Sequence, residues 1–218
     1  MLWSKFASTL STLSVLSSHR VLGRTFVRLP SVRFANNALF MSTSSGGSAS
    51  TGWCRICESE EDVEDLASYI ASVAGNGDVI LMRGDLGAGK TTFARSLIRT
   101  KFDDPSMRVT SPSYLLDNTY EYDDGHIHHM DLYRLPTGCD LSILGIPEIY
   151  SSALCIIEWP ERMGDKLPSE HLDVEMIIDS DGSRAVRLTS RGEKWTEKLD
   201  FLFDGSKSIY EGVVRRDS

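Results

Sequence analysis

The sequence predicts an α/β fold in which strands buried on both faces alternate with helices. Two continuous apolar runs, Val79–Met82 and Ala153–Ile157, are typical of strands that are covered on both sides. The first run leads through a glycine-rich turn into a helical pattern, and two pairs of strand-like stretches are joined by short turns, as in β-hairpins. The chain has 218 residues, 41% hydrophobic and 25% charged, which is enough to bury a substantial core.

The first predicted strand, Trp53–Cys57, contains two of the four cysteines in a lone CxxC pattern. A zinc site would need a second pair of ligands, and only Cys139 and Cys155 remain, far apart in the sequence. We therefore interpret Cys54 and Cys57 as ordinary strand residues. A metal or redox role is the alternative.

A helix is predicted to follow this strand. Ser59 and Asp62 resemble a capping box, which pairs the first N–H groups of a helix. Apolar residues at helical spacing mark its buried face: Val63, Leu66, Ala67, Ile70, Ala71 and Ala74. The stretch Gly75-Asn76-Gly77 is expected to end it.

The segment after the first buried strand carries the clearest chemical pattern in the chain. Residues 84–91 read GDLGAGKT, which matches the phosphate-binding pattern G-x-x-x-x-G-K-[ST] between a predicted strand and a predicted helix. The glycines let successive N–H groups point inward as an anion cradle, beside the positive end of the helix. We expect the following residues to bind the phosphates of a nucleoside triphosphate: Gly84, Asp85, Leu86, Gly87, Ala88, Gly89, Lys90, Thr91 and Thr92. Lys90 is expected to reach the β- and γ-phosphates, and the hydroxyl of Thr91 to ligate Mg²⁺.

The helix after this loop is predicted to bury Phe93, Ala94, Leu97 and Ile98 and to turn Arg95 and Arg99 toward water. A hydroxyl-rich bend follows, with Thr110, Ser111 and Ser113 at the place where nucleotide-sensing switch loops often lie. Ordinary turn chemistry is the alternative for these hydroxyls.

A β-hairpin is predicted next, from Tyr114–Tyr122 and His126–Asp131 around a short turn. In a strand, His126 and His128 would share one face and His129 would lie on the other. Since no third convergent ligand is evident, we place these histidines on the hairpin surface, in structural hydrogen bonds, rather than in a metal site.

Two acidic residues end predicted strands. Asp131 closes the hairpin, and Glu158 follows the buried run Ala153–Ile157, at the position where a Walker-B acid holds Mg²⁺ directly or through water. A solvated strand-end glutamate is the alternative. Between these two residues we expect a short helical piece around Leu141–Ile149.

The remaining sequence predicts a second hairpin, a closing helix and a tail. Leu172–Asp179 and Arg184–Ser190 are the hairpin strands, Glu193–Phe203 is the helix, and residues 204–218 are expected to form a loose tail. The folded domain is thus predicted over residues 51–203.

Residues 1–50 differ in composition from the rest. Residues 1–57 contain six basic and no acidic residues, which leaves 17 basic and 31 acidic residues, a net charge of −14, for residues 58–218. The first 50 residues are rich in Ser, and they are predicted to be an organellar transit peptide with a flexible linker, with a mitochondrial address favoured over a plastid one. No apolar run approaches the length of a membrane span, and the acidic body is poorly suited to holding nucleic acid directly.

The motifs GDLGAGKTT, TSPSY, HHMDLYRL and IIEWPE, in this order, resemble those of the TsaE-type (YjeE-like) ATPases of tRNA threonylcarbamoyladenosine biosynthesis, over roughly Trp53 to Ser190. Ser113 stands where that family more often has Thr, and Met130 where it more often has Phe. The resemblance implies a P-loop NTPase fold with a central, mostly parallel sheet, antiparallel hairpin additions and flanking helices.

The resemblance also implies weak Mg²⁺-dependent ATP hydrolysis, stimulated by docking on a threonylcarbamoyl-transferase complex of TsaD- and TsaB-like proteins. The ATPase would reset that complex and meet tRNA only indirectly. Carried over to this sequence, Lys90 and Thr91 handle phosphate and Mg²⁺, and Glu158 supports the metal. Asp131 is the second acidic group, near the metal or the attacking water, and Trp159 lies beside the site.

Other classes of P-loop protein fit less well. A small-molecule kinase needs an Arg-rich lid, whereas Arg134 and Arg184 stand isolated in the sequence. A GTPase is disfavoured because no N-K-x-D pattern occurs. A non-catalytic scaffold, in which ATP fixes a docking shape, stays open as a third alternative.

Overall fold

The structure is a computed structural model that describes residues 52–123, 125–203 and 214–216, all within one unit. The strands in these residues are β1 (Gly52–Cys57), β2 (Val79–Arg83), β3 (Asp117–Tyr122), β4 (Gly125–Asp131), β5 (Leu154–Glu158), β6 (His171–Ile178), β7 (Arg184–Arg191) and β8 (Val214–Arg216). The α-helices are α1 (Glu60–Val73), α2 (Lys90–Lys101) and α3 (Glu193–Phe203), and the 3-10 helices are η1 (Ser142–Leu144), η2 (Glu148–Ser151) and η3 (Pro160–Lys166). The predicted transit segment, residues 1–50, lies outside the described residues.

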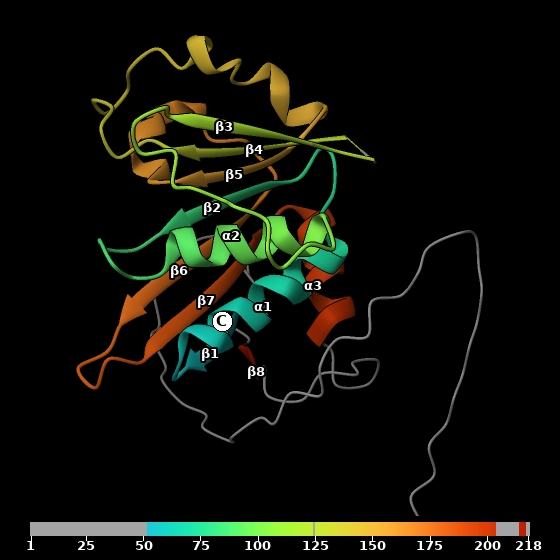
Figure 1. Ribbon diagram of the computed structural model, residues 1–218, viewed down its shortest axis with the longest axis vertical. Helices are drawn as coiled ribbons and strands as arrows, with labels where there is room; N and C mark the ends of the chain where they lie inside the picture. Colours follow the sequence, from blue (N-terminus) through green and yellow to red (C-terminus); the bar gives the residue numbers. More distant parts are fainter. Residues whose placement is uncertain (1–51, 124, 204–213, 217–218) are drawn as a thin grey trace, which may run out of the picture. The chain divides into compact units, whose positions relative to one another are not determined.

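All eight strands form one sheet in the order β3-β4-β5-β2-β6-β7-β1-β8 (Figure 1). The four central strands β4, β5, β2 and β6 pair in parallel. The pairings of β3 with β4, β6 with β7, β7 with β1 and β1 with β8 are antiparallel. This arrangement confirms the predicted α/β fold with a mostly parallel core and antiparallel additions.

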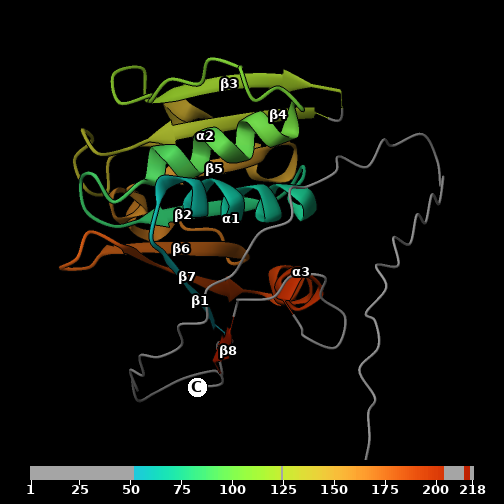
Figure 2. The same ribbon diagram turned by 60° about the horizontal axis from the view of Figure 1, so that its bottom comes forward.

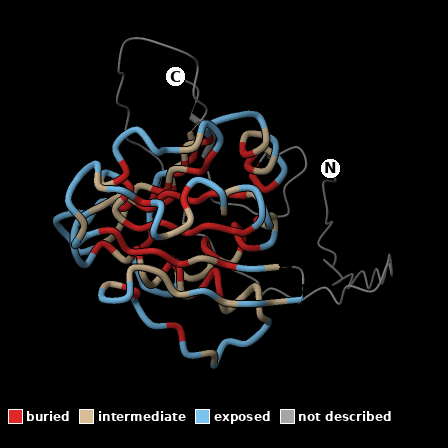
Figure 3. The backbone as a smooth tube through the Cα atoms, turned by 90° about the horizontal axis from the view of Figure 1, so that it is seen from above, coloured by how far each residue is buried: buried red, intermediate tan, exposed pale blue. Residues whose placement is uncertain are grey.

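The central strands are apolar because both faces of the sheet are covered. On one face α1 and α2 lie side by side (Figure 2) and pack with Ile80 and Met82 of β2 in one hydrophobic cluster. On the other face, Leu81 and Ile157 pack with side chains from the segment that carries the 3-10 helices. Every residue of β5 is buried, and Figure 3 shows the buried residues concentrated along these central strands.

Helix α1 begins as its sequence predicts. The N–H of Asp62 donates to the Ser59 hydroxyl at 3.2 Å, and the N–H of Ser59 donates to the Asp62 carboxylate at 3.0 Å. This reciprocal capping satisfies backbone groups that have no partner inside the helix. The predicted apolar face of α1 is buried from Val63 to Ala74.

The first cysteine pair belongs to a strand, as we interpreted it. Cys57 faces the core from β1, where burial raises the pKa of its thiol to about 12. Cys54 lies on the opposite face of β1, and the two cysteines are not joined in a disulfide. Among the described residues no three His, Cys, Asp or Glu side chains converge as a metal site.

Three predictions of local structure were wrong in part. Strand β3 begins at Asp117 instead of Tyr114, because a turn closed by the N–H of Leu116 on the carbonyl of Pro112 at 2.7 Å occupies residues 112–116. The expected helical piece around Leu141–Ile149 is split into η1 and η2 by Gly145, whose backbone is left-handed with φ 69°. Within the expected loose tail, residues 214–216 form β8 and extend the sheet beyond β1.

The arginines of α2 also depart from expectation. Arg95 and Arg99 are half-buried instead of facing water. Their Nε–H groups donate to the carbonyls of Val109 and Met107 at 3.2 and 2.9 Å. These hydrogen bonds therefore connect the segment before the hydroxyl-rich bend to the helix that follows the glycine-rich loop.

None of the helices in the described part of the chain combines the length and the apolar character that a membrane span requires.

Candidate functional site

The glycine-rich loop connects the buried strand β2 to α2. Gly84, Gly87 and Gly89 have φ values of 131°, 81° and 106°, which side-chain-bearing residues rarely adopt. At Gly84 a Cβ atom would lie 2.3 Å from the carbonyl oxygen of Met176, so the loop rests directly on the backbone of β6. The first N–H groups of an α-helix have no partner within the helix, and Gly89, the N-cap of α2, offers no side chain to accept from them.

The side chain of Lys90 folds back over this loop. Its Nζ donates to the carbonyls of Gly84 and Asp85 at 2.7 and 2.8 Å, and it lies 4.0 Å from the ring centroid of Trp159. Burial lowers the pKa of the Lys90 ammonium, while the nearby charges of Glu158 and Asp131 act in the opposite direction. The loop thus keeps a cation beside two acidic residues.

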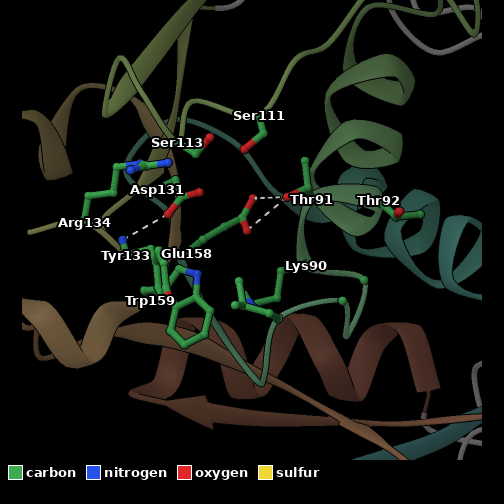
Figure 4. Close-up of a pocket in the computed structure, with 13 residues that line it drawn as sticks. Lys90, Thr91, Thr92, Ser111, Ser113, Asp131, Tyr133, Arg134, Glu158 and Trp159 are labelled. Carbon is green, nitrogen blue, oxygen red and sulfur yellow. Dashed lines mark hydrogen bonds between the residues drawn. The ribbon is translucent and has the colours of Figure 1, made fainter.

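The acidic pair comes from two adjacent parallel strands. Asp131 ends β4 and Glu158 ends β5, and the two residues are partners in the strand register. Only 6% of Asp131 and 2% of Glu158 is exposed. The hydroxyl of Thr91, at the start of α2, lies 2.9 and 3.1 Å from the two carboxylate oxygens of Glu158 (Figure 4). Thr91, Glu158 and Asp131 are therefore brought together at one edge of the sheet.

Asp131 is held in a different way from Glu158. Its carboxylate accepts the N–H of Tyr133 at 3.0 Å. Burial raises the pKa of Asp131, the N–H of Tyr133 opposes this rise, and the charge of Glu158 adds to it. A buried carboxylate that holds its proton more tightly than usual is suited to exchange a proton with water.

The sequence analysis did not place His129 beside the acidic pair. It was expected on the hairpin surface, but its side chain is fully buried and its Nε2 lies 2.9 Å from Oε1 of Glu158. His126 and His128 do lie on the other face of β4, where His128 pairs with Asp117 at 2.7 Å. The available signal was the two-residue spacing between His129 and Asp131, which places both on one face of the strand.

A pocket of about 430 Å³ opens over these groups. Its lining residues are Leu86, Gly87, Gly89, Lys90, Thr91, Thr92, Ser111, Ser113, Asp131, Tyr133, Arg134, Glu158 and Trp159. Six of the nine loop residues predicted to bind phosphate thus line it, although the hydroxyl of Thr92 donates to Glu60 of α1. The other three, Gly84, Asp85 and Ala88, support the loop with their backbone carbonyls.

The hydroxyl-rich bend contributes to the pocket in part. Ser111 and Ser113 line it, whereas the Oγ1 and carbonyl oxygen of Thr110 accept bonds from Asn118. The ring of Tyr133 packs on that of Trp159, with their centroids 4.8 Å apart. Trp159 therefore lies beside the site, in contact with both Lys90 and Tyr133.

Two arginines that looked isolated in the sequence also reach the site. Arg134 lines the pocket with its guanidinium 4.4 Å from the ring centroid of Tyr114. Arg184, at the start of β7, donates from Nε to the carbonyl of Ala88 at 3.2 Å and so supports the glycine-rich loop. Sequence spacing could not show either contact, because both depend on how distant segments meet.

A strand, a glycine-rich loop and a helix beside an acidic strand end define a protein of the P-loop NTPase type. The family described as "Threonylcarbamoyl adenosine biosynthesis protein TsaE" matches residues 57–186. That match spans more than half of the chain, from the end of β1 into β7. The chain belongs to the TsaE family.

Individual proteins agree with this family. A tRNA threonylcarbamoyladenosine biosynthesis protein TsaE from Aquifex aeolicus is 40% identical over 134 residues, covering 61% of this chain and 92% of that protein. The protein of the same description from Rickettsia conorii is 34% identical over 162 residues, covering 73% and 92%. The crystal structure of YdiB from Bacillus subtilis superposes with a TM-score of 0.60 at 23% identity, over 71% of this chain and 95% of YdiB, and supports the fold.

Proposed function

We propose that this chain binds Mg²⁺ and ATP in the pocket and hydrolyses ATP weakly, as a step in tRNA threonylcarbamoyladenosine modification. The observation that carries the proposal is the contact of the Thr91 hydroxyl with Glu158, at 2.9 and 3.1 Å, with Asp131 opposite Glu158 in the strand register. This places a hydroxyl from the phosphate loop and two strand-end carboxylates around one point. The relatives' shared description supplies the process.

The donor set fits Mg²⁺ held together with phosphate. Mg²⁺ prefers oxygen ligands and is commonly bound by one or two protein groups plus phosphate oxygens, not by a complete protein cage. Thr91 and Glu158 offer hydroxyl and carboxylate oxygens at the loop. In the described part of the chain no group of three His, Cys, Asp or Glu side chains could hold a metal without a nucleotide. We therefore assign Thr91 and Glu158 as the metal-holding residues.

Each residue of the site has a separate task in this proposal. Residues 84–92 bind the phosphates through their N–H groups, and Lys90 leaves the carbonyls of Gly84 and Asp85 to neutralise phosphate charge. Bound Mg²⁺ would supply further neutralisation of the charge that develops during phosphoryl transfer. Asp131, whose pKa is raised by burial, orients the attacking water or accepts its proton.

The role in the pathway depends on a partner. The body of the chain is strongly acidic, with a net charge of −14 over residues 58–218, which disfavours direct binding of an RNA backbone. We propose that residues 51–203 act as an ATPase domain that docks on a threonylcarbamoyl-transferase complex of TsaD- and TsaB-like proteins and resets it. The chain then meets tRNA only through that complex. Residues 1–50 would direct it to an organelle, with the mitochondrion favoured over the plastid.

The first test measures binding. Mg·ATP at about 1,000 times its Kd should stabilise the protein by about 4 kcal/mol, which raises the melting temperature by several degrees. Lys90→Ala should largely remove this shift, whereas Glu121→Gln, on the exposed edge of β3, should keep it. An unchanged melting temperature of the wild type in saturating Mg·ATP would contradict the proposed site.

The second test measures turnover with labelled ATP, with and without the transferase complex. Asp131→Asn should lower the hydrolysis rate more than the nucleotide affinity, because its interaction is made mainly in the transition state. Glu158→Gln should lower Mg²⁺-dependent hydrolysis strongly and leave metal-free nucleotide binding in place. Wild-type rates for both variants in the stimulated reaction would remove the acidic pair from the mechanism. A phosphorylated acceptor instead of free phosphate would indicate a kinase, and no product would indicate a scaffold.

A further inference from the structure

The environment of His129 is unusual for a histidine in the interior of a sheet. Its side chain is fully buried, and Nε2 lies 2.9 Å from Oε1 of Glu158. A carboxylate oxygen accepts, so Nε2 carries the proton and donates it. The other ring nitrogen, Nδ1, is buried and has no hydrogen-bond partner among the described residues. His129 therefore makes one specific contact, and that contact is with the site.

This arrangement is not favourable for folding. A buried polar atom without a partner destabilises the folded state, and an apolar side chain of similar size would avoid the loss. The strand partners of His129 are Asn118 on β3 and Ile156 on β5, and Ile156 belongs to the core. A residue that costs stability at such a position is expected to serve the site it contacts.

Glu158 needs an anchor other than Thr91. The Thr91 hydroxyl has one proton, which faces both carboxylate oxygens at 2.9 and 3.1 Å and so does not distinguish between them. Thr91 is also a proposed metal ligand, and its oxygen has a second task. His129 contacts Oε1 only, and it does so from β4, a rigid parallel neighbour of the strand that carries Glu158.

We infer that His129 is a positioning residue that fixes the rotation of the Glu158 carboxylate toward the phosphate loop. Its hydrogen bond holds Oε1 against β4, which leaves the direction of Oε2 set by the geometry of the carboxylate. Such outer contacts orient metal-binding groups, and their loss commonly costs about 10- to 100-fold in metal affinity. This inference rests on the proposed function, because it concerns Mg²⁺ that is bound together with nucleotide.

The test compares the nucleotide affinity of each variant with Mg²⁺ and with EDTA, by calorimetric titration with ADP. His129→Leu removes the donor, and His129→Gln can return an N–H near the position of Nε2. His128→Gln is the matched control, because His128 lies on the other face of β4 and pairs with Asp117. Titration of Mn²⁺ into the ADP complex, followed by the electron spin resonance of free Mn²⁺, measures metal affinity without any turnover.

We expect the substitution to reduce only the gain in nucleotide affinity that Mg²⁺ provides. His129→Leu should lose about 10-fold or more of the affinity gained from Mg²⁺ and bind Mn²⁺ correspondingly more weakly. Its ADP affinity in EDTA should match the wild type. His129→Gln should recover part of the gain, and the control should keep all of it.

Three outcomes would overturn the inference in distinguishable ways. If the wild type shows a Mg²⁺-dependent gain and His129→Leu retains it in full, the inference is wrong and the proposed function stands. If the wild type itself gains nothing from Mg²⁺, the proposed function fails and the inference with it. If His129→Leu does not fold, His129→Gln decides: equal losses of affinity in Mg²⁺ and in EDTA would mean that His129 only supports the fold.

Discussion

Replacing Gly84 and Gly87 separately by alanine should separate the folding role of the phosphate loop from its binding role. Both residues have positive φ, 131° and 81°, so each alanine carries a backbone strain of about 1–3 kcal/mol. They differ in surroundings. A Cβ at Gly84 would lie 2.3 Å from the carbonyl oxygen of Met176, whereas a Cβ at Gly87 meets nothing within 4 Å.

The clash at Gly84 sets the expected difference. Because the obstacle is backbone of β6 and not a flexible side chain, the strand must move, and such overpacking costs about 1–3 kcal/mol. Gly84→Ala should therefore unfold at lower urea concentration than Gly87→Ala, by about 2 kcal/mol, which corresponds to roughly 4–8 °C in a thermal melt. Gly87 lines the pocket, so Gly87→Ala should weaken Mg·ATP binding, while its loss of stability should be limited to the backbone strain that both variants share.

The assay is urea unfolding followed by circular dichroism, with calorimetric titration of Mg·ATP on the same preparations. A Gly87→Ala protein that is as destabilised as Gly84→Ala would refute the claim that β6 supports the loop by direct contact. Full Mg·ATP affinity in Gly87→Ala would refute its place in the pocket.

Three further predictions concern other parts of the chain. The folded pKa of Asp131 lies above its ordinary value of 3.8, so between these two values the folded state binds more protons than the unfolded state, and the charge of Asp131 destabilises the fold at neutral pH. Asp131→Asn should therefore raise the melting temperature of the EDTA-treated protein near neutral pH, and this gain should shrink as the pH falls toward 3.8; a constant difference would contradict the raised pKa. Cys57 and Cys155, whose pKa values are raised by burial to about 12, should resist iodoacetamide in the native protein at about pH 8, and their labelling before Cys54 in mass spectra would contradict their burial. A fluorescent protein carrying residues 1–50 should enter an organelle, and a diffuse cytosolic signal would argue against the import signal.

The parts of the site that a short sequence pattern encodes could be predicted. The loop needs glycines at fixed spacing because its backbone adopts positive φ values that other residues rarely adopt. Glu158 ends an apolar stretch that only a strand covered on both faces would tolerate. Local capping likewise fixed the start of α1, because Ser59 and Asp62 satisfy each other without help from the rest of the chain.

The parts that depend on tertiary pairing could not be predicted in the same way. The sequence of β4 gives alternating faces, but only its pairing with β5 shows that the face with His129 is buried against Glu158. The late start of β3 depends on a turn in which Leu116 adopts φ 67°, a conformation that its residue type does not suggest. The local sequence around Arg134 and Arg184 does not indicate that they reach the site, because their partners Tyr114 and Ala88 lie far away in the sequence.

The pairing of Asp131 with Glu158 in neighbouring parallel strands makes their separation a property of the sheet. Adjacent strands lie about 4.8 Å apart wherever the ladder is intact, so the segments before β4 and between β4 and β5 can lengthen or shorten without moving the two carboxylates apart. A deletion of one residue inside β4 acts differently, because it would turn the Asp131 side chain to the opposite face of the sheet. Among related proteins, the length of those connections should therefore vary often, whereas the length of β4 should rarely change.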